Sequence, residues 1–253
     1  MRNQRVKRQF NKQDSQFAHW SVGKNINYLK GYYDFCDITS KDTLLDVACG
    51  PGDFTIFAAG QISSAYGIDI SDREIEIARK QSEDAGLKNI QFHCADVEYL
   101  PNADNSFSIV LCKSAFHHFV NSDRVLREMK RCCEPSGKIS IQDIVMYDDD
   151  YVNNYFETFD RFIDISHNRT LGISEINRLF QNNTISKSKE FRLDVDLNVN
   201  EYIGHALQAS GEKVEIKKLL IRGQQDRKLS EFLFRKEGEL FFKRPVYLIL
   251  GTK

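Results

Sequence analysis

The stretch that decides the fold is LLDVACGPGDFT, which runs from Leu44 to Thr55. An apolar, strand-like segment leads into a glycine turn, and a helical pattern follows the turn. In open α/β sheets this arrangement lies at the carboxyl end of a parallel strand, where nucleotide-like ligands bind. Gly50 and Gly52 let a ligand approach the backbone closely. The stretch therefore predicts an α/β fold with a ligand site at the turn.

Strand-like and helical patterns alternate on both sides of this turn as far as Asp143, which is typical of a doubly wound parallel sheet. The strand-like segments are 43–48, 65–69, 90–95, 107–113 and 138–143. The helical segments between them are 53–60, 72–85 and 122–133. We therefore expect a Rossmann-like, doubly wound, mostly parallel sheet of seven strands.

The flanking regions have patterns of their own. Before the first strand, apolar residues recur near helical spacing and predict two or three helices that form a cap. These residues are Val6, Phe10, Phe17, Trp20, Ile26, Leu29 and Tyr33. After Asp143 we expect helices at 151–165, 173–180 and 200–209, a strand at 189–197 and a hairpin at 239–252.

We interpret residues 1–253 as a single domain without a linker. Its expected parts are a helical cap (1–40), a ligand-binding core (41–143), a helical insertion after the fifth strand (144–198), and a C-terminal helix with closing strands (199–253). The insertion breaks the alternation of strand and helix, and this departure is expected to shape the substrate pocket.

Composition excludes several classes of partner. The 35 basic and 36 acidic residues give a net charge of -1, so no global charge attracts nucleic acid or an anionic membrane. No segment approaches the roughly 20 apolar residues of a membrane span, and no apolar run follows the basic opening, so we expect a cytoplasmic protein. The six cysteines form no C-x-x-C pair, which predicts no metal site.

The residues around the turn indicate the charge of the ligand. Asp46 and Asp53 flank the turn, and Thr55 stands where a dinucleotide-binding pattern needs its third glycine. A pyrophosphate would meet negative charge here, whereas a ligand with an ammonium and a sulfonium group would meet favourable charge. The turn therefore favours a cationic nucleoside.

Two further acids follow the next strands. Asp69 ends the second strand in GIDIS, where a carboxylate can accept hydrogen bonds from both ribose hydroxyls. Asp96 follows the third strand, where its carboxylate and the backbone N–H of Val97 can bind the amino edge of adenine. Taken singly, each acid also suits a turn or a helix cap. Their ordered spacing favours a nucleoside site.

The ordered segments DVACGPGDFT, GIDIS, CADVEYLPNADNSFSIVLCKSAFHHF and VLREMKRCCEPSGKI resemble the successive motifs of class I S-adenosylmethionine-dependent methyltransferases. The branch resembled is the UbiE-like small-molecule group (methyltransferase type 11), and the likeness covers roughly residues 6–143. It implies S-adenosyl-L-methionine as the cofactor. The sequence departs at Ser136, where related proteins have glycine, and we expect this to affect a turn only.

The resemblance also implies roles for single residues. Asp46, Ala48, Gly50 and Gly52 would contact the methionine part of the cofactor. Ile70 would join Asp69 at the ribose and adenine, and Cys49 and Lys113 are carried over as further cofactor contacts.

The methyl acceptor is expected next to the cofactor. A general base is needed only if the acceptor must lose a proton during attack. The candidates are His117 and His118 after the fourth strand, Asp143 at the end of the fifth, and His167 in the insertion; for the histidine pair a structural role is the alternative. Candidates for binding the acceptor are Phe17, Trp20 and Arg169, and Phe10 and Tyr28 are further aromatic residues that can close over the pocket.

Three alternatives stay open at this point. A nicotinamide-dependent oxidoreductase is disfavoured by the missing third glycine and the acidic turn. A nucleic-acid methyltransferase is disfavoured because CKSAFHHF lacks the Asn/Asp-Pro-Pro-aromatic segment that holds an extruded base. A non-catalytic regulator that binds S-adenosylmethionine is the third. We expect a small-molecule acceptor methylated on O, N, C or S, and a monomer or homodimer.

Overall fold

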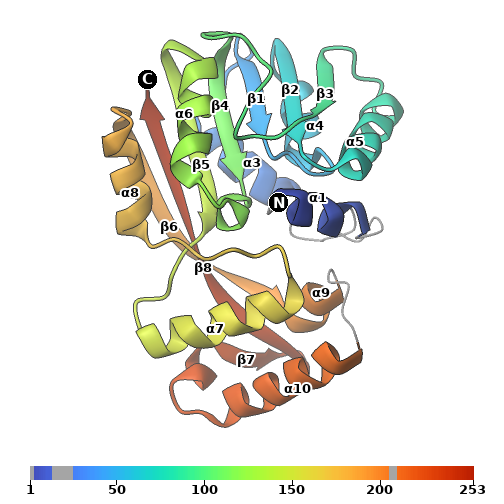
Figure 1. The fold of residues 1–253 in the computed structure, drawn as a ribbon, viewed down its shortest axis with the longest axis vertical. Helices are drawn as coiled ribbons and strands as arrows, with labels where there is room; N and C mark the ends of the chain where they lie inside the picture. Colours follow the sequence, from blue (N-terminus) through green and yellow to red (C-terminus); the bar gives the residue numbers. More distant parts are fainter. Residues whose placement is uncertain (1–2, 13–24, 205–209) are drawn as a thin grey trace.

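The computed structural model describes residues 3–12, 25–204 and 210–253, and these contain one central sheet of eight strands (Figure 1). Seven strands follow the order β3-β2-β1-β4-β5-β8-β6, and β7 pairs with β8 outside this path. Strands β1 to β5 pair in parallel, whereas β8 is antiparallel to β5, β6 and β7. The predicted Rossmann-like, mostly parallel architecture is confirmed.

The six strands expected before residue 199 are present as β1 to β6. The bounds of all eight strands are β1 (Thr43–Val47), β2 (Ser64–Asp69), β3 (Ile90–Cys94), β4 (Phe107–Lys113), β5 (Cys133–Ile144), β6 (Ser186–Asn198), β7 (Leu233–Lys236) and β8 (Glu239–Thr252). The helices between them are α4 (Asp53–Ala59), α5 (Asp72–Asp84), α6 (Ser122–Cys132), α7 (Asp150–Ile163), α8 (Ile173–Asn182), α9 (Val199–Gly204) and α10 (Ser210–Gln225), with short 3-10 turns η2 (Phe116–His118) and η3 (Leu229–Glu231).

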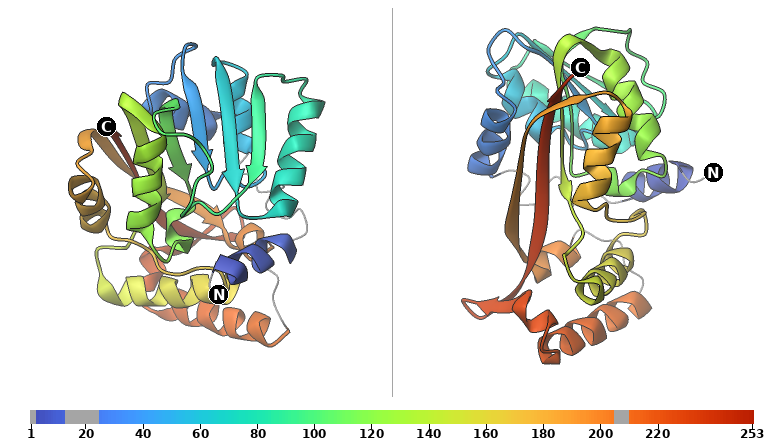
Figure 2. Two further views of the ribbon diagram at one scale, coloured as in Figure 1. Left: turned by 45° about the horizontal axis from the view of Figure 1, so that its top comes forward. Right: turned by 90° about the vertical axis from the view of Figure 1, so that its left-hand side faces the viewer.

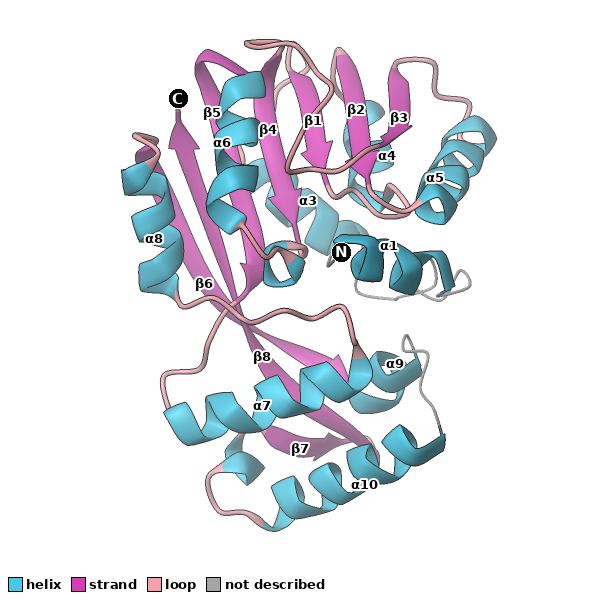
Figure 3. Cartoon of the chain, in the orientation of Figure 1, coloured by secondary structure: helices cyan, strands magenta, loops and turns pink. Residues whose placement is uncertain are grey.

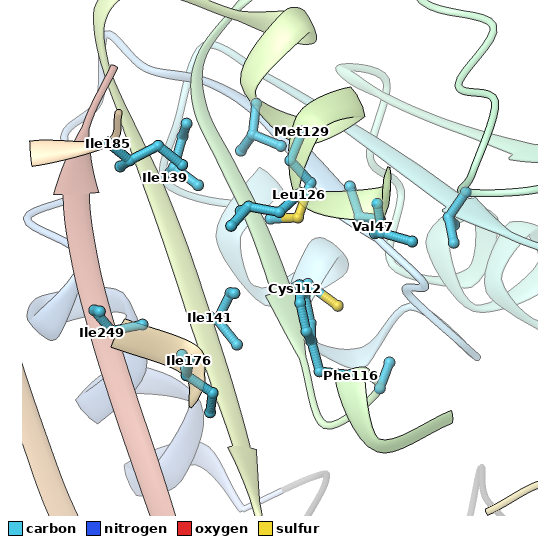
Figure 4. Packing of buried hydrophobic residues seen from close by; sticks show 14 of the residues in the cluster. Val47, Cys112, Phe116, Leu126, Met129, Ile139, Ile141, Ile176, Ile185 and Ile249 are labelled. Atoms are coloured by element: carbon cyan, nitrogen blue, oxygen red, sulfur yellow. The ribbon is translucent and has the colours of Figure 1, made fainter. Parts of the chain in front are cut away.

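Alternate residues of the central strands point to opposite faces and bury both. Leu45 and Val47 of β1 pack with residues of α6 and α8, whereas Leu44 packs with residues of α4 and the cap helix α3 (Ile26–Phe35). Figure 2 shows these helices on the two sides of the sheet. Figure 4 shows the first face, where Leu126 and Met129 meet side chains of the sheet.

The N-terminal cap is seen as α1 (Asn3–Lys12) and α3. Lys7 of α1 forms an ion pair with Asp72 at the start of α5, with Nζ and Oδ2 2.7 Å apart. The Ser71 hydroxyl donates to Asn11 Oδ1 over 2.7 Å. These contacts hold α1 across the carboxyl ends of the parallel strands, which is the edge where we expect a ligand (Figure 1).

A second layer of structure lies beyond this edge. The long strands β6 and β8 extend beyond the ends of the parallel strands. There they meet α7, α9, α10 and β7 around an aromatic core (Figures 1 and 3). Arg244 of β8 is buried there, pairs with Asp160 of α7, and lies over the rings of Tyr147 and Phe156. The insertion and the C-terminal segment therefore share one core.

One expectation for the C-terminal part is wrong, and two of its elements, β7 and α10, were not predicted. The hairpin at 239–252 is wrong, because this segment is one continuous strand and its hairpin partner is β7, the unpredicted eighth strand. The helix expected at 200–209 is observed as α9 over 199–204, and residues 205–209 lie outside the described part. The helix α10 was not placed by the sequence reading.

Within residues 3–12, 25–204 and 210–253, no helix is both long and apolar enough to serve as a membrane span. The same residues contain no cluster of three or more His, Cys, Asp or Glu side chains with the geometry to hold a metal ion.

Candidate active site

A cavity opens at the carboxyl ends of β1, β2 and β4, under α1. Its wall contains six acidic residues, whereas the basic residues that line it are Lys113 and His118. The acids are Asp46, Asp53, Asp69, Glu74, Asp96 and Glu98. The remaining lining residues are Val6, Phe10, Ala48, Cys49, Gly50, Pro51, Phe54, Ile70, Val97, Ser114, Ala115 and Phe119. This excess of carboxyl groups favours a cationic ligand.

The glycine turn forms the floor of the cavity. Gly50 has φ of +53°, and a Cβ there would meet nothing within 4 Å, so its backbone is open to a ligand. Gly52 differs, because it does not line the cavity and a Cβ there would lie 2.8 Å from the Phe92 ring. The structure therefore gives Gly52 a role in packing the turn against β3, where the sequence had indicated a cofactor contact.

Asp46, at the base of the turn, is 2% exposed. Its Oδ2 accepts a hydrogen bond of 2.6 Å from the Thr55 hydroxyl, while its buried Oδ1 has no partner among the described residues. Burial raises the pKa of Asp46 to about 7. The residue that replaces the third glycine thus positions this carboxyl group, and its remaining oxygen can accept a donor from a ligand.

Asp69, at the end of β2, is tied to the same turn. Its Oδ2 accepts from the Gly50 N–H at 2.9 Å, and its Oδ1 accepts from the Ser71 N–H at 2.8 Å. Burial raises the pKa of Asp69 despite these two donors. Each oxygen has a second lone pair, so the carboxylate can still accept hydrogen bonds from a ligand.

Glu74, in the first turn of α5, also lines the cavity and was missed by the sequence reading. It is 1% exposed, and neither of its carboxyl oxygens has a partner among the described residues. Burial, together with the nearby Asp69 and Asp53, raises the pKa of Glu74 to about 8. Charged residues in the first turn of a helix usually face solvent, so no local signal distinguished it.

Lys113 ends β4 and lines the cavity on the side of the acceptor region. Burial lowers the pKa of its ammonium group, an effect opposed by the negative charges of Asp46, Asp53 and Asp143. Its Nζ lies 5.2 Å from the centre of the Tyr28 ring. Tyr28 itself is held by a hydrogen bond from Gln142 and does not line the cavity.

The far end of the cavity contains the remaining nucleoside candidates. Ile70, Asp96 and Val97 all contribute to its wall, as their positions after β2 and β3 predicted. The Oδ1 of Asp96 accepts a hydrogen bond of 3.0 Å from the Glu98 N–H, which shapes the loop after β3.

A second cavity adjoins the first at Val6 and His118, which line both. The other residues of its wall are Arg161, Ile165, Ser166, His167 and Asn168. The Ser166 hydroxyl lies 2.5 Å from Asp164 Oδ1 and 3.1 Å from His118 Nδ1. If that hydroxyl donates to the carboxylate, Nδ1 of His118 donates to the hydroxyl, and Nε2, which lies 3.8 Å from Asp164 Oδ2, carries the ring's lone pair. Burial and the neighbouring His117 lower the pKa of His118 to about 4.

His117 lines neither cavity and lies behind His118, with ring centres 4.1 Å apart. Its Nδ1 is 2.7 Å from Asp143 Oδ1, and its backbone N–H donates to Asp143 Oδ2 over 2.9 Å. Although burial opposes both charges, contact between them outweighs it, so the pKa of His117 is raised and that of Asp143 is lowered. The pair fixes the turn that presents His118.

The remaining acceptor-side candidates are also paired. His167 lines the second cavity, and its Nε2 is 3.2 Å from Glu157 Oε1 on α7. Arg169 lines neither cavity, because its guanidinium group forms two hydrogen bonds to Glu175, of 3.0 and 2.8 Å. Its charge is therefore already matched within the protein.

Aromatic residues of the cap were also expected near the acceptor. Phe10 lines the first cavity, and its ring meets that of His118 edge-on with centres 5.3 Å apart. Phe17 and Trp20 lie outside the described residues. Phe54 and Phe119 are lining residues that the sequence reading missed.

The model of the methyltransferase domain family matches residues 38–194, which is more than half of the chain. The chain belongs to this methyltransferase family. The match includes β1 to β5 and therefore the strands that carry the acids of the first cavity. The family membership and the predicted resemblance agree.

Curated relatives carry the same family name. The methyltransferase YcgJ of Bacillus subtilis, itself uncharacterized, is 27% identical over 143 residues, which are 56% of each chain. A demethylmenaquinone methyltransferase of Lactobacillus johnsonii is 31% identical over 125 residues, which are 48% of this chain and 51% of the relative. The chain thus spans about half the length of the curated relatives it matches.

Solved structures share the fold over a longer range. The crystal structure of YcgJ superposes with a TM-score of 0.81 at 21% identity, covering 89% of this chain and 97% of that one. These findings confirm the predicted methyltransferase family and S-adenosylmethionine as its cofactor. The cavity fits this cofactor, because the unpartnered Asp46 oxygen and the surrounding acids suit a ligand with two cationic groups.

Proposed function

We propose that this chain transfers a methyl group from S-adenosylmethionine to a small-molecule acceptor by in-line displacement. The observation that carries the proposal is the buried Asp46 oxygen, which has no partner among the described residues and lies on the floor of a cavity walled by acids. A buried polar atom without a partner costs about 1–3 kcal/mol, so a ligand that supplies a donor recovers this free energy.

The proposed cofactor contacts follow the cavity from end to end. When bound, S-adenosylmethionine supplies an electrophilic methyl group on a sulfonium leaving group. Asp46 and the open backbone of Gly50 would hold the methionine part, and Asp69 would accept the ribose hydroxyls. Asp96 and Val97 would meet the adenine. Ala48, Cys49, Ile70 and Lys113 also line the wall and complete the proposed cofactor site.

The acceptor is proposed to bind where the two cavities adjoin. His118 lies at this junction, and its Nε2 can accept a hydrogen bond from an exchangeable proton of the acceptor. A pKa of about 4 makes His118 a weak base that stays neutral at pH 7. This favours an acceptor with a free amine or a readily ionised hydroxyl over an unactivated carbon or an alcohol.

His117, Asp143 and His167 are proposed to act through position. The pair His117–Asp143 holds the turn that carries His118, and His167 with Glu157 holds the loop that forms the opposite wall. Both pairs are complete without a ligand, so they supply a rigid frame for the acceptor.

The test has two stages. Calorimetry first compares S-adenosylmethionine with NAD; tighter binding of NAD would contradict the cofactor. The protein is then incubated with labelled S-adenosylmethionine and a metabolite extract, and mass spectrometry identifies the methylated product. Cofactor binding without S-adenosylhomocysteine in any extract would support a non-catalytic regulator.

Variants of His118 test the acceptor side. His118→Leu removes the acceptor atom and is expected to lower the transfer rate about 100-fold, while His118→Gln keeps a hydrogen-bond acceptor and recovers part of the rate. His93, which is exposed on β3, gives the control His93→Leu. Equal rates for the three variants would contradict the proposed role.

A further inference from the structure

Among the described residues, the carboxyl group of Glu74 has no hydrogen-bond partner. It occupies the third position of α5, after the N-cap Ser71. In a capping box, glutamate at this position accepts a hydrogen bond from the backbone N–H of the N-cap residue. Here that N–H donates to Asp69 Oδ1 at 2.8 Å. The Glu74 side chain is therefore left unused by its helix.

The surroundings of Glu74 also provide no partner. Both carboxyl oxygens are buried and unpartnered among the described residues, and the side chain lines the first cavity. Arg73 of the same helix instead lies near Glu76, with Nη1 and Oε2 3.8 Å apart. Natural proteins leave few buried polar groups without a hydrogen bond, so each such group calls for an explanation.

The chemistry of the pocket narrows the ligand group that Glu74 can meet. Asp69 and Asp53 are close enough to raise its pKa, which is about 8, so Glu74 is mostly neutral at pH 7. A neutral carboxyl group has one donor and one acceptor, and so does a hydroxyl group. An anionic ligand group would be repelled by the two aspartates. Asp69 already marks the place expected for the ribose.

We propose that Glu74 is a further cofactor-binding residue, whose carboxyl group hydrogen-bonds a ribose hydroxyl of S-adenosylmethionine beside Asp69. The proposal rests on the cofactor of the proposed function. It predicts that Glu74 reduces the stability of the free protein and increases its affinity for the cofactor, a combination that a purely structural residue would not show.

The test compares three variants by calorimetry with S-adenosylhomocysteine and by thermal unfolding without ligand. Glu74→Met fills similar space without hydrogen bonds, so we expect an unchanged or higher Tm and an affinity lowered by roughly tenfold or more. Glu74→Gln keeps a donor and an acceptor, and its affinity is expected to stay within about threefold of the original protein. Glu76→Met, at an exposed position on the same helix, is the control and should change neither quantity.

Ligand analogues locate the contact. The original protein should bind 2′-deoxy or 3′-deoxy S-adenosylhomocysteine more weakly than the parent compound, and Glu74→Met should lose little further affinity for the analogue that lacks the contacted hydroxyl. Unchanged affinity of Glu74→Met for the parent compound would overturn the proposal, as would equal losses for the parent and both analogues. If the original protein fails to bind S-adenosylhomocysteine at all, the cofactor site itself is refuted.

Discussion

Carboxyl groups behave differently at the two ends of the proposed active site, where Asp46, Glu74 and Asp143 are buried and Glu157 is partly buried. On the proposed cofactor side, Asp46 and Glu74 have oxygens without partners in the described part of the chain, and burial raises the pKa of each. On the acceptor side, Asp143 and Glu157 face His117 and His167. Burial opposes their ionisation, but these partners outweigh it, so the pKa of Asp143 is lowered and that of Glu157 falls to about 2.

This difference indicates what each end needs from a ligand. Unpartnered acids make the cofactor side incomplete until a cation and hydrogen-bond donors arrive. On the acceptor side the acids already have partners. Asp143 pairs with His117 in the turn that carries His118, and Glu157 pairs with His167 in the neighbouring loop. Replacing an acid should therefore affect binding at one end and folding at the other.

The largest expected effect is on the paired side. Asp143 is buried and His117 is 14% exposed, so Asp143→Ala leaves a largely enclosed His117 without its counter-charge, and we expect the free energy of unfolding to fall by about 3 kcal/mol. Chemical denaturation measures this value, and Asp143→Asn, which keeps an acceptor for His117, should lose less. A change below about 1 kcal/mol would remove the distinction between the two ends.

The second largest effect is on the unpartnered side. Asp46→Asn removes a buried charge that would meet a cationic group of the cofactor, so we expect affinity for S-adenosylmethionine to fall about 30-fold or more. Calorimetry gives the affinity, and denaturation of the free protein should show equal or higher stability. A less stable free protein with full affinity would reverse the assignment of Asp46.

The pH dependence of stability sharpens the comparison. A carboxyl group whose pKa is raised by folding favours the folded state at low pH, and this advantage is lost as pH rises from the unfolded value through the folded one. This pH window runs from about 4 to about 7 for Asp46 and from about 4 to about 8 for Glu74. The original protein should thus lose on the order of 2 kcal/mol more than Asp46→Asn between pH 5 and 8. Parallel Tm curves for the two proteins would contradict this.

Thr55 gives a smaller effect on the cofactor side. Thr55→Val removes the hydroxyl that donates to Asp46 Oδ2 and keeps the shape of the side chain. We expect cofactor affinity to fall about fivefold to tenfold, because the Thr55 hydrogen bond favours the ionised form of Asp46 that would meet a cationic group. Thr55→Ser keeps the hydroxyl and is the control in the same calorimetric titration.

The smallest effect concerns Arg169. Its contacts with Glu175 are half-exposed, so Arg169→Ala is expected to cost about 0.2–1 kcal/mol in the free energy of unfolding. Product formation in the extract assay should stay the same. A clear loss of product at unchanged stability would restore Arg169 as an acceptor-binding residue.

The sequence predicted the parallel half of the sheet well, because strand and helix alternate there without interruption. It failed at β8, which was expected to be a hairpin but is one continuous strand that contains Pro245. The Pro245 carbonyl accepts from the Val145 N–H at 3.0 Å, on the side of β5. Its missing N–H faces the same side, just where β5 stops pairing, so a continuous strand loses no hydrogen bond with β6.

The acids of the cavity were predictable for a topological reason. Asp46, Asp69 and Asp96 end or follow parallel strands, and the carboxyl ends of such strands meet at one edge. Glu74 was not predictable, since its burial depends on how α5 packs beneath the glycine turn and α1. The pairing of Asp143 with His117 and of His167 with Glu157 likewise depends on contacts between distant segments, which no local pattern encodes.

The position of β8 also has a consequence for how the protein is made. The last strand of the chain lies between β5 and β6, so the sheet cannot close until about residue 252 has left the ribosome. Strands β1 to β4 and the glycine turn can form before then, but until β8 is made β6 has no strand to pair with. Exposed strand edges promote aggregation during such a wait. Truncating β8 during synthesis should therefore yield insoluble protein even though the cofactor turn is intact.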